Sequence, residues 1–187
     1  MSGCKEIVMT KDKSSHEDNC GFRMFKCPLG YVNCHWKGFQ VEIITHVSSQ
    51  HKRNVLYGPN HVLQVSLENP VQFNNGWIVA ALGEIFFVNA ILNVPHSQLF
   101  ACVQYIGARR QVKDFMYTFT VTCDESDTNR KVTYCRTAHS DLDKLRNFYN
   151  INDCFVMKSD GLQHFATDGI VHLKLELSKI SQEQQEN

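Results

Sequence analysis

The stretch that decides the fold is residues 115–123, which read FMYTFTVTC. Apolar residues occupy its odd positions and threonines fill most of the even ones, which is the period of a β-strand with one buried face. Residues 171–177 read VHLKLEL and alternate in the same way. Both segments are therefore predicted to be strands that bury one face and expose the other.

Six further segments are predicted strands with weaker patterns, separated by clusters of Asn, Gly, Pro, Asp and Ser. They are residues 62–67, 77–82, 85–92, 99–106, 131–136 and 154–157. About eight short strands with hairpin-length gaps are typical of an antiparallel β-sandwich. One helix, capped by Ser140, is expected to interrupt them. Its apolar face would consist of Leu142, Leu145, Phe148 and Tyr149.

The chain has 187 residues, 43% of them hydrophobic, and it balances 19 Lys and Arg against 19 Asp and Glu. This composition is that of a folded chain rather than a disordered one. A protein that binds nucleic acid through its phosphates usually carries an excess of basic residues. The zero net charge therefore argues against nucleic-acid binding as the main function.

Neither a secretory signal nor a membrane span is expected. Residues 1–19 lack the apolar run of a signal peptide, and the apolar stretches 77–82 and 85–92 are too short to cross a bilayer. We therefore expect the protein to lie in a reducing compartment. The cytoplasm is the first expectation and the nucleus the second. Disulfides are therefore a poor explanation of the eight cysteines.

The composition changes along the chain. Four of the eight cysteines and four of the nine histidines lie in the first 51 residues, whereas alternating Val, Ile, Phe and Thr dominate from Val62 onward. Gly58-Pro59-Asn60 is a turn signal between the two parts. We predict a small Cys/His-rich module at residues 1–53, a β-sandwich at 60–180 and a polar tail at 181–187.

The spacing of Cys27, Cys34, His46 and His51 predicts a zinc site, with six, eleven and four residues between successive members. Zinc takes four such ligands in a tetrahedron, and two close pairs about a dozen residues apart let a turn supply one pair and a helix the other. The alternative is a set of scattered surface histidines and buried thiols, which explains the ordered spacing less well.

The residues between these ligands favour a finger. Phe39, Ile43 and Val47 have helical spacing, so a short helix is expected to carry His46 and to end near His51. Trp36 and Phe39 would supply the small apolar core that a module of this size needs.

A second set, Cys4, His16 and Cys20, has eleven and three intervening residues. It would form a Cys-Cys-His-Cys site if another cysteine lay seven positions before Cys4. We interpret it as a degenerate or truncated finger that is one ligand short. Catalytic zinc with water as the fourth ligand is the less favoured alternative, because no general base is evident nearby.

The remaining cysteines are expected to be buried thiols, since free cysteine often behaves as a small hydrophobic residue. They are Cys102, Cys123, Cys135 and Cys154. A nucleophilic pair of Cys154 and His164 is a less favoured alternative, because no orienting third group is visible. The basic residues Arg109, Arg110 and Lys113, which follow Gly107, are interpreted as a solvated hairpin tip.

The seven Cys and His residues of both sets resemble the zinc-finger pair of the Siah/Sina (seven in absentia) ubiquitin ligases, including HEDNC at 16–20 and CHWKG at 34–38. The resemblance continues in the strands. It is carried by FA at 100–101, VQ at 103–104, IG at 106–107, Arg109, Gln111, Phe115, Tyr117, DC at 153–154, FA at 165–166 and GI at 169–170.

This resemblance implies a mainly β protein in which a zinc-finger module precedes a TRAF-like antiparallel β-sandwich that forms a homodimer. It also implies that degradation substrates or adaptors bind as extended peptides, at an edge that supplies main-chain hydrogen bonds. By position, the peptide groove would involve Leu56, Asn75, Trp77 and Val79. Core packing is an equally good explanation of Trp77.

In this family, ligase activity depends on a RING, a double zinc site with eight Cys or His ligands that recruits the ubiquitin-conjugating enzyme. The chain has no residues left for one. We therefore expect a zinc-binding adaptor or regulator of ubiquitination and degradation, without a catalytic residue of its own. Complete Siah-type ligases would be partners, with a ubiquitin-conjugating enzyme reached through them. The alternatives are a fragment of a complete ligase and a nucleic-acid-binding zinc-finger protein.

Overall fold

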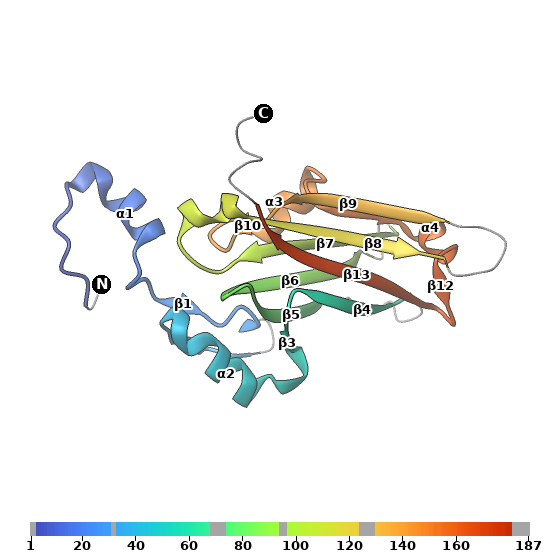
Figure 1. The fold of residues 1–187 in the computed structure, drawn as a ribbon, viewed down its shortest axis with the longest axis horizontal. Helices are drawn as coiled ribbons and strands as arrows, with labels where there is room; N and C mark the ends of the chain where they lie inside the picture. Colours follow the sequence, from blue (N-terminus) through green and yellow to red (C-terminus); the bar gives the residue numbers. More distant parts are fainter. Residues whose placement is uncertain (1–2, 31–32, 68–73, 94–96, 124–129, 181–187) are drawn as a thin grey trace.

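The computed structural model describes residues 3–30, 33–67, 74–93, 97–123 and 130–180, and two stacked β-sheets dominate it (Figure 1). The Cys/His-rich residues lie at one end of this sandwich. The predicted fold class, a small module followed by a mainly β sandwich, is confirmed.

The first sheet has six strands, and β6 and β7 lie at its centre. The strands are β3 (Val55–Tyr57), β5 (Asn74–Ala81), β6 (Glu84–Asn93), β7 (Gln98–Tyr105), β10 (His139–Ser140) and β11 (Phe155–Lys158). The longer strands pair antiparallel, as predicted, whereas the short strands β3 and β10 pair in parallel with β5 and β7. The expectation of a wholly antiparallel sandwich is corrected in these two places.

The second sheet has five strands, with β13 paired to β4 on one edge and to β8 and β12 on the other. The strands are β4 (Asn60–Ser66), β8 (Phe115–Thr122), β9 (Lys131–Thr137), β12 (Ala166–Thr167) and β13 (Ile170–Lys179). Along β8 buried and half-buried residues alternate at every position, and β13 alternates between buried and exposed residues over most of its length. The strand pattern read from residues 115–123 and 171–177 is confirmed, as are the six weaker strands.

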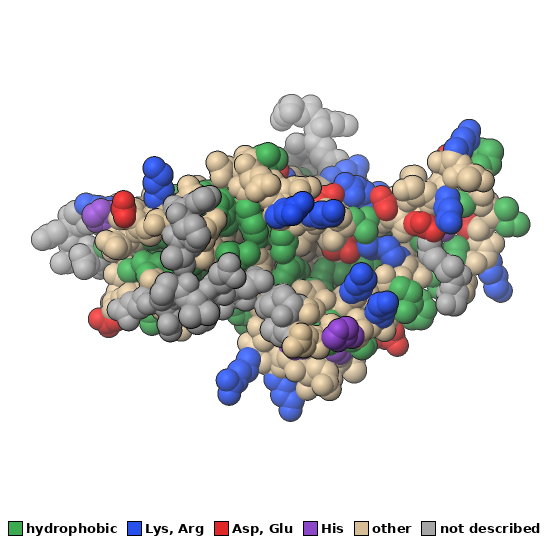
Figure 2. Space-filling view, turned by 180° about the vertical axis from the view of Figure 1, so that it is seen from behind, with side chains coloured by type: hydrophobic (Ala, Val, Ile, Leu, Met, Phe, Trp, Pro, Cys, Tyr) green, Lys and Arg blue, Asp and Glu red, His purple; other side chains and the backbone are tan. Residues whose placement is uncertain are grey.

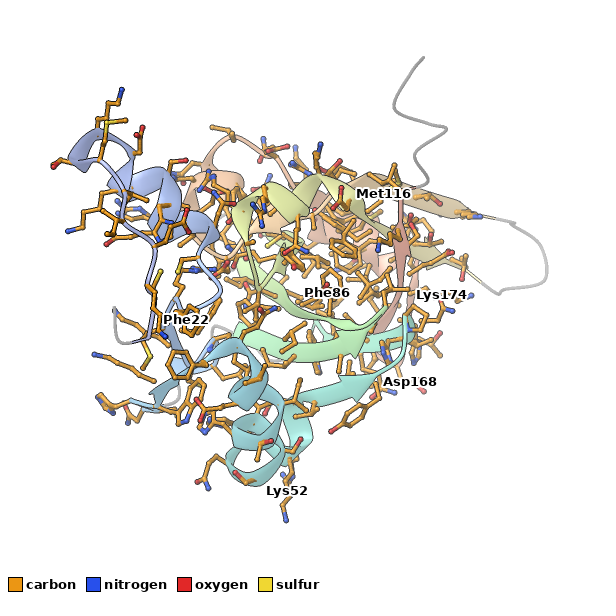
Figure 3. The ribbon with its side chains drawn as sticks, turned by 60° about the vertical axis from the view of Figure 1, so that its left-hand side comes forward. Phe22, Lys52, Phe86, Met116, Asp168 and Lys174 are labelled. Atoms are coloured by element: carbon orange, nitrogen blue, oxygen red, sulfur yellow. The ribbon has the colours of Figure 1, made fainter. Side chains whose placement is uncertain are left out.

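The main core lies between the sheets. Phe86 of β6 is fully buried in it against the ring of Phe115, and Figure 3 shows Phe86 inside the sandwich while Lys174 lies outside. Strand β6 does not alternate, because six consecutive residues of it are buried. Both faces of the first sheet are therefore covered.

The helices are short and lie outside the sheets. They are α1 (Lys13–Asn19), α2 (Ile43–Gln50), α3 (Leu145–Asn150) and α4 (Ser159–Gln163), with 3-10 turns at Thr10–Asp12, Gln40–Glu42, Lys52–Asn54 and Arg109–Asp114.

The predicted start of α3 is wrong. The helix begins at Leu145, five residues after the expected cap Ser140, which instead belongs to β10. The side-chain amide of Gln104 donates hydrogen bonds to the carbonyls of Ser140 and Asp143, at 2.8 Å each. These bonds and the pairing of β10 with β7 hold the segment against the sheet, so the helix forms only beyond it.

The second half of the Cys/His-rich module packs directly on the outer face of the six-stranded sheet. One apolar cluster joins the two parts. The module contributes Phe25, Cys27, Leu29, Ile43 and Val47, and the sheet and the turn after β7 contribute Ile78, Ile85, Phe87 and Ile106. The module therefore has no separate hydrophobic core of its own.

Arg23 fixes the module to the sandwich by polar contacts. Its guanidinium donates to both carboxylate oxygens of Asp141, at 2.9 and 2.8 Å, and to the carbonyl of Gly107 at 2.7 Å. It also lies 4.1 Å above the ring of Phe25. A side chain at Gly107 would place its Cβ 2.4 Å from the hydroxyl of Tyr105, so the turn that accepts Arg23 requires glycine.

The ion pair of Arg23 and Asp141 should contribute more to stability than the equally short pair of Arg109 and Asp143. The side chains of the first pair are 13% and 18% exposed, and those of the second 46% and 33%. Burial raises the pKa of the Asp141 carboxyl, and Arg23 opposes that effect. Loss of the guanidinium would leave a poorly solvated carboxylate.

We expect Arg23→Ala to lower the free energy of unfolding by about 2 kcal/mol. The matched control Arg109→Ala should change it by less than about 0.5 kcal/mol, because water screens that pair. Chemical denaturation of both zinc-loaded variants measures the difference. Equal losses in the two variants would contradict the role assigned to Arg23.

Candidate metal centre

The structure brings together the four residues predicted as zinc ligands in the second half of the module. Cys27 directly follows β1 (Phe25–Lys26), and Cys34 lies in the loop that leads to β2 (Lys37–Gly38), which pairs with β1. His46 projects from α2, and His51 is the residue at which α2 ends. A hairpin thus supplies one pair and a helix the other, as the spacing predicts.

The geometry of this cluster fits zinc. One donor atom from each of the four residues lies within 4.8 Å of the others. The Sγ atom of Cys27 is 3.5 Å from Nε2 of His51, and that of Cys34 is 3.3 Å from Nε2 of His46. A tetrahedral ion with ordinary Zn–S and Zn–N bonds holds sulfur and nitrogen about 3.6 Å apart. The four side chains are thus close to the spacing that the ion requires.

Burial favours the neutral forms of Cys27 and His46 when no metal is bound. Burial, together with the nearby Cys34, raises the pKa of the Cys27 thiol to about 11. Burial and the proximity of His51 lower the pKa of His46. Zinc binding would reverse this preference for the thiols, because the metal binds the thiolate.

The packing around the ligands holds them in place. The ring of Trp36 stacks on that of His46, with centroids 4.4 Å apart and planes 4° from parallel. Ile43 and Val47, one turn apart on α2, have no exposed surface. Trp36 packs against the shared cluster as predicted, whereas Phe39 is not part of it. Phe25 and Leu29 contribute the buried apolar side chains expected from Phe39.

The first cluster contains Cys4, His16 and Cys20, which the structure also brings together. Their donor atoms lie within 4.8 Å of one another, and no fourth Cys, His, Asp or Glu among the described residues joins them. Nε2 of His16 is 3.4 Å from Sγ of Cys4, and its Nδ1 is 3.3 Å from a carboxylate oxygen of Glu6. A carboxylate behind a histidine is typical of metal sites, because it fixes the orientation of the ring. Sequence reasoning missed Glu6, which no spacing pattern marks.

The residues predicted for a peptide groove lie on two neighbouring strands. Leu56 lies on β3 and Trp77 lies on β5. Both side chains are partly buried and pack against the main core. Val79 has no exposed surface, so it cannot contact a ligand directly in this structure. Asn75 is part of β5, but its side chain lies outside the described residues.

The other cysteines differ from one another in exposure. Cys102 and Cys154 are buried as expected, but Cys123 is only half-buried and Cys135 is exposed. Cys135 faces outward because it alternates along β9 with residues that point to the core. Burial raises the pKa of Cys154 to about 12, and His164 is exposed. A protonated, buried thiol is a poor nucleophile, so the structure gives no support to the pair of Cys154 and His164.

On the face that Figure 2 shows, the charged side chains of the described residues are scattered rather than gathered in one basic patch. Arg109, Arg110 and Lys113 are exposed, as expected for a solvated segment, but they lie on a 3-10 turn between the two sheets rather than at a hairpin tip. Arg109 pairs with Asp143, and the backbone N–H of Arg110 donates to Asn19 of α1 at 2.8 Å.

Among the described residues, no helix has the length and apolar character needed to cross a membrane.

Comparison with known proteins gives two family matches. Residues 1–61 match the model of the Sina zinc finger, and residues 81–177 match that of the Sina TRAF-like domain. The chain is 28% identical over 188 residues to the E3 ubiquitin-protein ligase sina of Schistosoma mansoni, covering 96% of the chain and 48% of that relative. It is 22% identical over 185 residues to the protein of the same name from Drosophila melanogaster, covering 95% and 57%. The chain thus spans about half the length of the curated relatives it matches.

Loss of a ligand from the four-residue cluster should remove zinc and destabilise the whole chain, because Cys27 and α2 belong to the core shared with the sandwich. We expect Cys27→Ser and His46→Ala each to lower the bound zinc by about one ion per chain. The temperature at which the sandwich unfolds should fall as well. Mass spectrometry of metal content and calorimetry measure the two effects.

The matched control is His35→Ala, which removes an exposed histidine next to Cys34 that is not part of the cluster. It should retain both the zinc and the transition temperature. A zinc content that stays unchanged in Cys27→Ser and His46→Ala would contradict the assignment of these ligands.

Proposed function

The chain belongs to the Sina family, and on that premise we propose that it recognises proteins destined for ubiquitination, as an adaptor or regulator of the ubiquitin–proteasome pathway. The observation that carries this proposal is the joint presence of the zinc-finger module and the TRAF-like sandwich, packed together through one apolar cluster. The relatives named above are ubiquitin-protein ligases. These names support the pathway that we propose for this chain, and the adaptor role within it is the finer part of the proposal.

Zinc is the cofactor of the module, and its contribution is structural. We assign Cys27, Cys34, His46 and His51 as the ligands of one ion, because their donor atoms lie together. Four donors at tetrahedral spacing leave no position open for a substrate or water, so the role of this ion is structural. Cys4, His16 and Cys20 are the proposed ligands of a second ion. No step of a reaction needs to be assigned to either metal.

A free sheet edge supports the capture of extended peptides. Strand β3 ends the six-stranded sheet and pairs only with β5 among the described residues, so its other edge can accept a strand. The side chains of Leu56 on β3 and Trp77 on the neighbouring β5 are half-buried against the main core, so part of each is open to solvent. A peptide strand would gain main-chain hydrogen bonds there, and these side chains would select its residues.

Two forms of this function differ in how ubiquitin reaches the captured protein. We favour an adaptor that forms homodimers through its sandwich, associates with complete ligases in the cytoplasm or nucleus, and has no ligase activity of its own. The Cys and His clusters found among the described residues are those of the two fingers. The other form is a recognition part of a longer ligase. A nucleic-acid-binding role is less favoured, because the chain has no net charge.

Trp77→Ala should weaken partner capture, and because Trp77 also packs against the main core, chemical denaturation of the variant separates this loss from unfolding. We expect affinity purification followed by mass spectrometry to recover a set of proteins with the unchanged chain, and to lose most of them with Trp77→Ala. The matched control is Ile151→Ala, which shortens an apolar side chain that is 72% exposed at the end of α3, outside both proposed binding surfaces. It should retain the same partners. Identical partner sets for all three proteins would contradict a groove at β3 and β5.

A ubiquitination assay with the purified chain tests the adaptor form. We expect no ubiquitin chains with a panel of ubiquitin-conjugating enzymes, and chain formation on captured proteins only when a complete Sina-type ligase is added. Ubiquitin chains built by the purified chain alone would overturn the adaptor form.

A further inference from the structure

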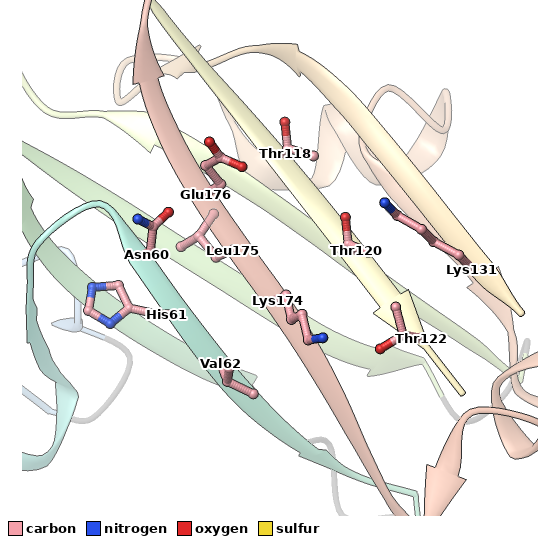
Figure 4. A pocket seen from close by; sticks show the side chains of 10 residues that line it. All are labelled: Asn60, His61, Val62, Thr118, Thr120, Thr122, Lys131, Lys174, Leu175 and Glu176. Carbon is pink, nitrogen blue, oxygen red and sulfur yellow. The ribbon is translucent and has the colours of Figure 1, made fainter. Parts of the chain in front are cut away.

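A hollow of about 460 Å³ lies on the outer face of the five-stranded sheet, and none of its lining residues belongs to the Cys/His clusters or to β3. Strands β4, β13, β8 and β9 all contribute to it (Figure 4). The residues that line it include Thr118, Thr120, Thr122, Lys131, Lys174 and Glu176. No feature of the zinc module or of the proposed peptide edge explains this arrangement.

A row of threonines on β8 forms the floor of the hollow. Thr118, Thr120 and Thr122 point outward because they alternate with the buried residues of the strand. The hydroxyl of Thr120 is 3.3 Å from that of Thr133 on β9. Hydroxyls ordered in this way on a rigid strand can donate hydrogen bonds to an anion that lies above them.

Two lysines flank this row from opposite strands. Lys174 of β13 lies opposite Thr120, and Lys131 of β9 lies opposite Thr122. Figure 4 shows both side chains extending toward the threonines from the two sides. Neither ammonium group has an acidic partner within 4.0 Å in the described part of the chain. Among the described residues, two positive charges therefore face the same hydroxyl groups with no ion-pair partner.

The opposite end of the hollow is acidic. Glu176 of β13 lies opposite Thr118, four residues from Thr122 along β8, or about 13 Å in an extended strand. The hollow thus has a positive and a negative end. Val62 lies beside Lys174 and is 56% exposed, so an apolar contact is available next to the positive end.

We propose that this hollow binds an extended segment of a partner protein that carries a phosphorylated serine or threonine. The phosphate lies between Lys131 and Lys174 and accepts hydrogen bonds from the threonine hydroxyls, while a Lys or Arg about four residues away in the segment faces Glu176. This surface would let phosphorylation control which proteins are held. It goes beyond the proposed function and does not depend on zinc or on the edge of β3.

A phosphate suits this site better than a single carboxylate. It carries nearly two negative charges and three acceptor oxygens, which match two ammonium groups and a row of hydroxyls. Charge-assisted hydrogen bonds of this kind are stronger than those between neutral groups. The fixed distance between the positive and negative ends requires a particular order of charges in the segment.

The test uses the zinc-loaded chain and a fluorescent nine-residue peptide rich in Val and Thr, with one phosphoserine and an arginine four positions away. We expect saturable binding that weakens as salt is raised. Removal of the phosphate should weaken it by at least about tenfold, and Lys131→Ala combined with Lys174→Ala should have an effect of similar size. Backbone amide shifts in NMR spectra should change along β8, β9 and β13.

The matched control is Lys158→Ala, which removes an exposed lysine from β11 of the other sheet and should leave the affinity unchanged. Trp77→Ala should also bind this peptide normally, so failure of the peptide edge and failure of this site are distinguishable. The proposal is overturned if the unphosphorylated peptide or a single-stranded RNA binds equally well, or if the double lysine variant binds as the unchanged chain does.

Discussion

The outer face of the six-stranded sheet imposes the main constraint on this protein. Strands β6 and β7 each carry long runs of buried residues, so the sheet needs an apolar cover on both sides. The second sheet covers one side. On the other side, the zinc module covers Ile85 and Phe87, and α3 covers Phe100 and Cys102. Without these covers the sheet would expose a large apolar surface to water.

This constraint joins metal binding to the stability of the sandwich. A finger of this size has too few apolar residues to form a stable core, and zinc normally provides the missing stability. Here Ile43 and Val47 of α2 obtain part of their burial from the sheet, and the sheet obtains its cover from them. Arg23 adds a polar contact at the same boundary. The two halves of the chain therefore act as one structural unit.

The two proposed binding surfaces use different properties of the sheets. At β3 the backbone of an edge strand is available, and Leu56 and Trp77 contribute apolar contacts. On the five-stranded sheet the backbone is already paired at β8 and β13, so recognition there would depend on side-chain charge and hydroxyl groups alone. Strand alternation explains the difference in character, because a sheet with one solvated face presents polar residues to water.

The sequence by itself predicted the eight longer strands and grouped Cys27, Cys34, His46 and His51 as candidate metal ligands. Alternation marks a strand such as 115–123 without knowledge of its neighbours, and the spacing of Cys27, Cys34, His46 and His51 reflects a local hairpin and helix. Tertiary structure alone decided the contacts between distant residues, such as Arg23 with Asp141, since nothing local distinguishes a buried arginine from a solvated one. It also decided where α3 begins, because the pairing of Ser140 with β7 outweighs its preference for a helix cap, and it placed Lys131 and Lys174 on either side of one threonine row. Local patterns follow from the chemistry of neighbouring residues, whereas these contacts depend on how the sheets pair and stack.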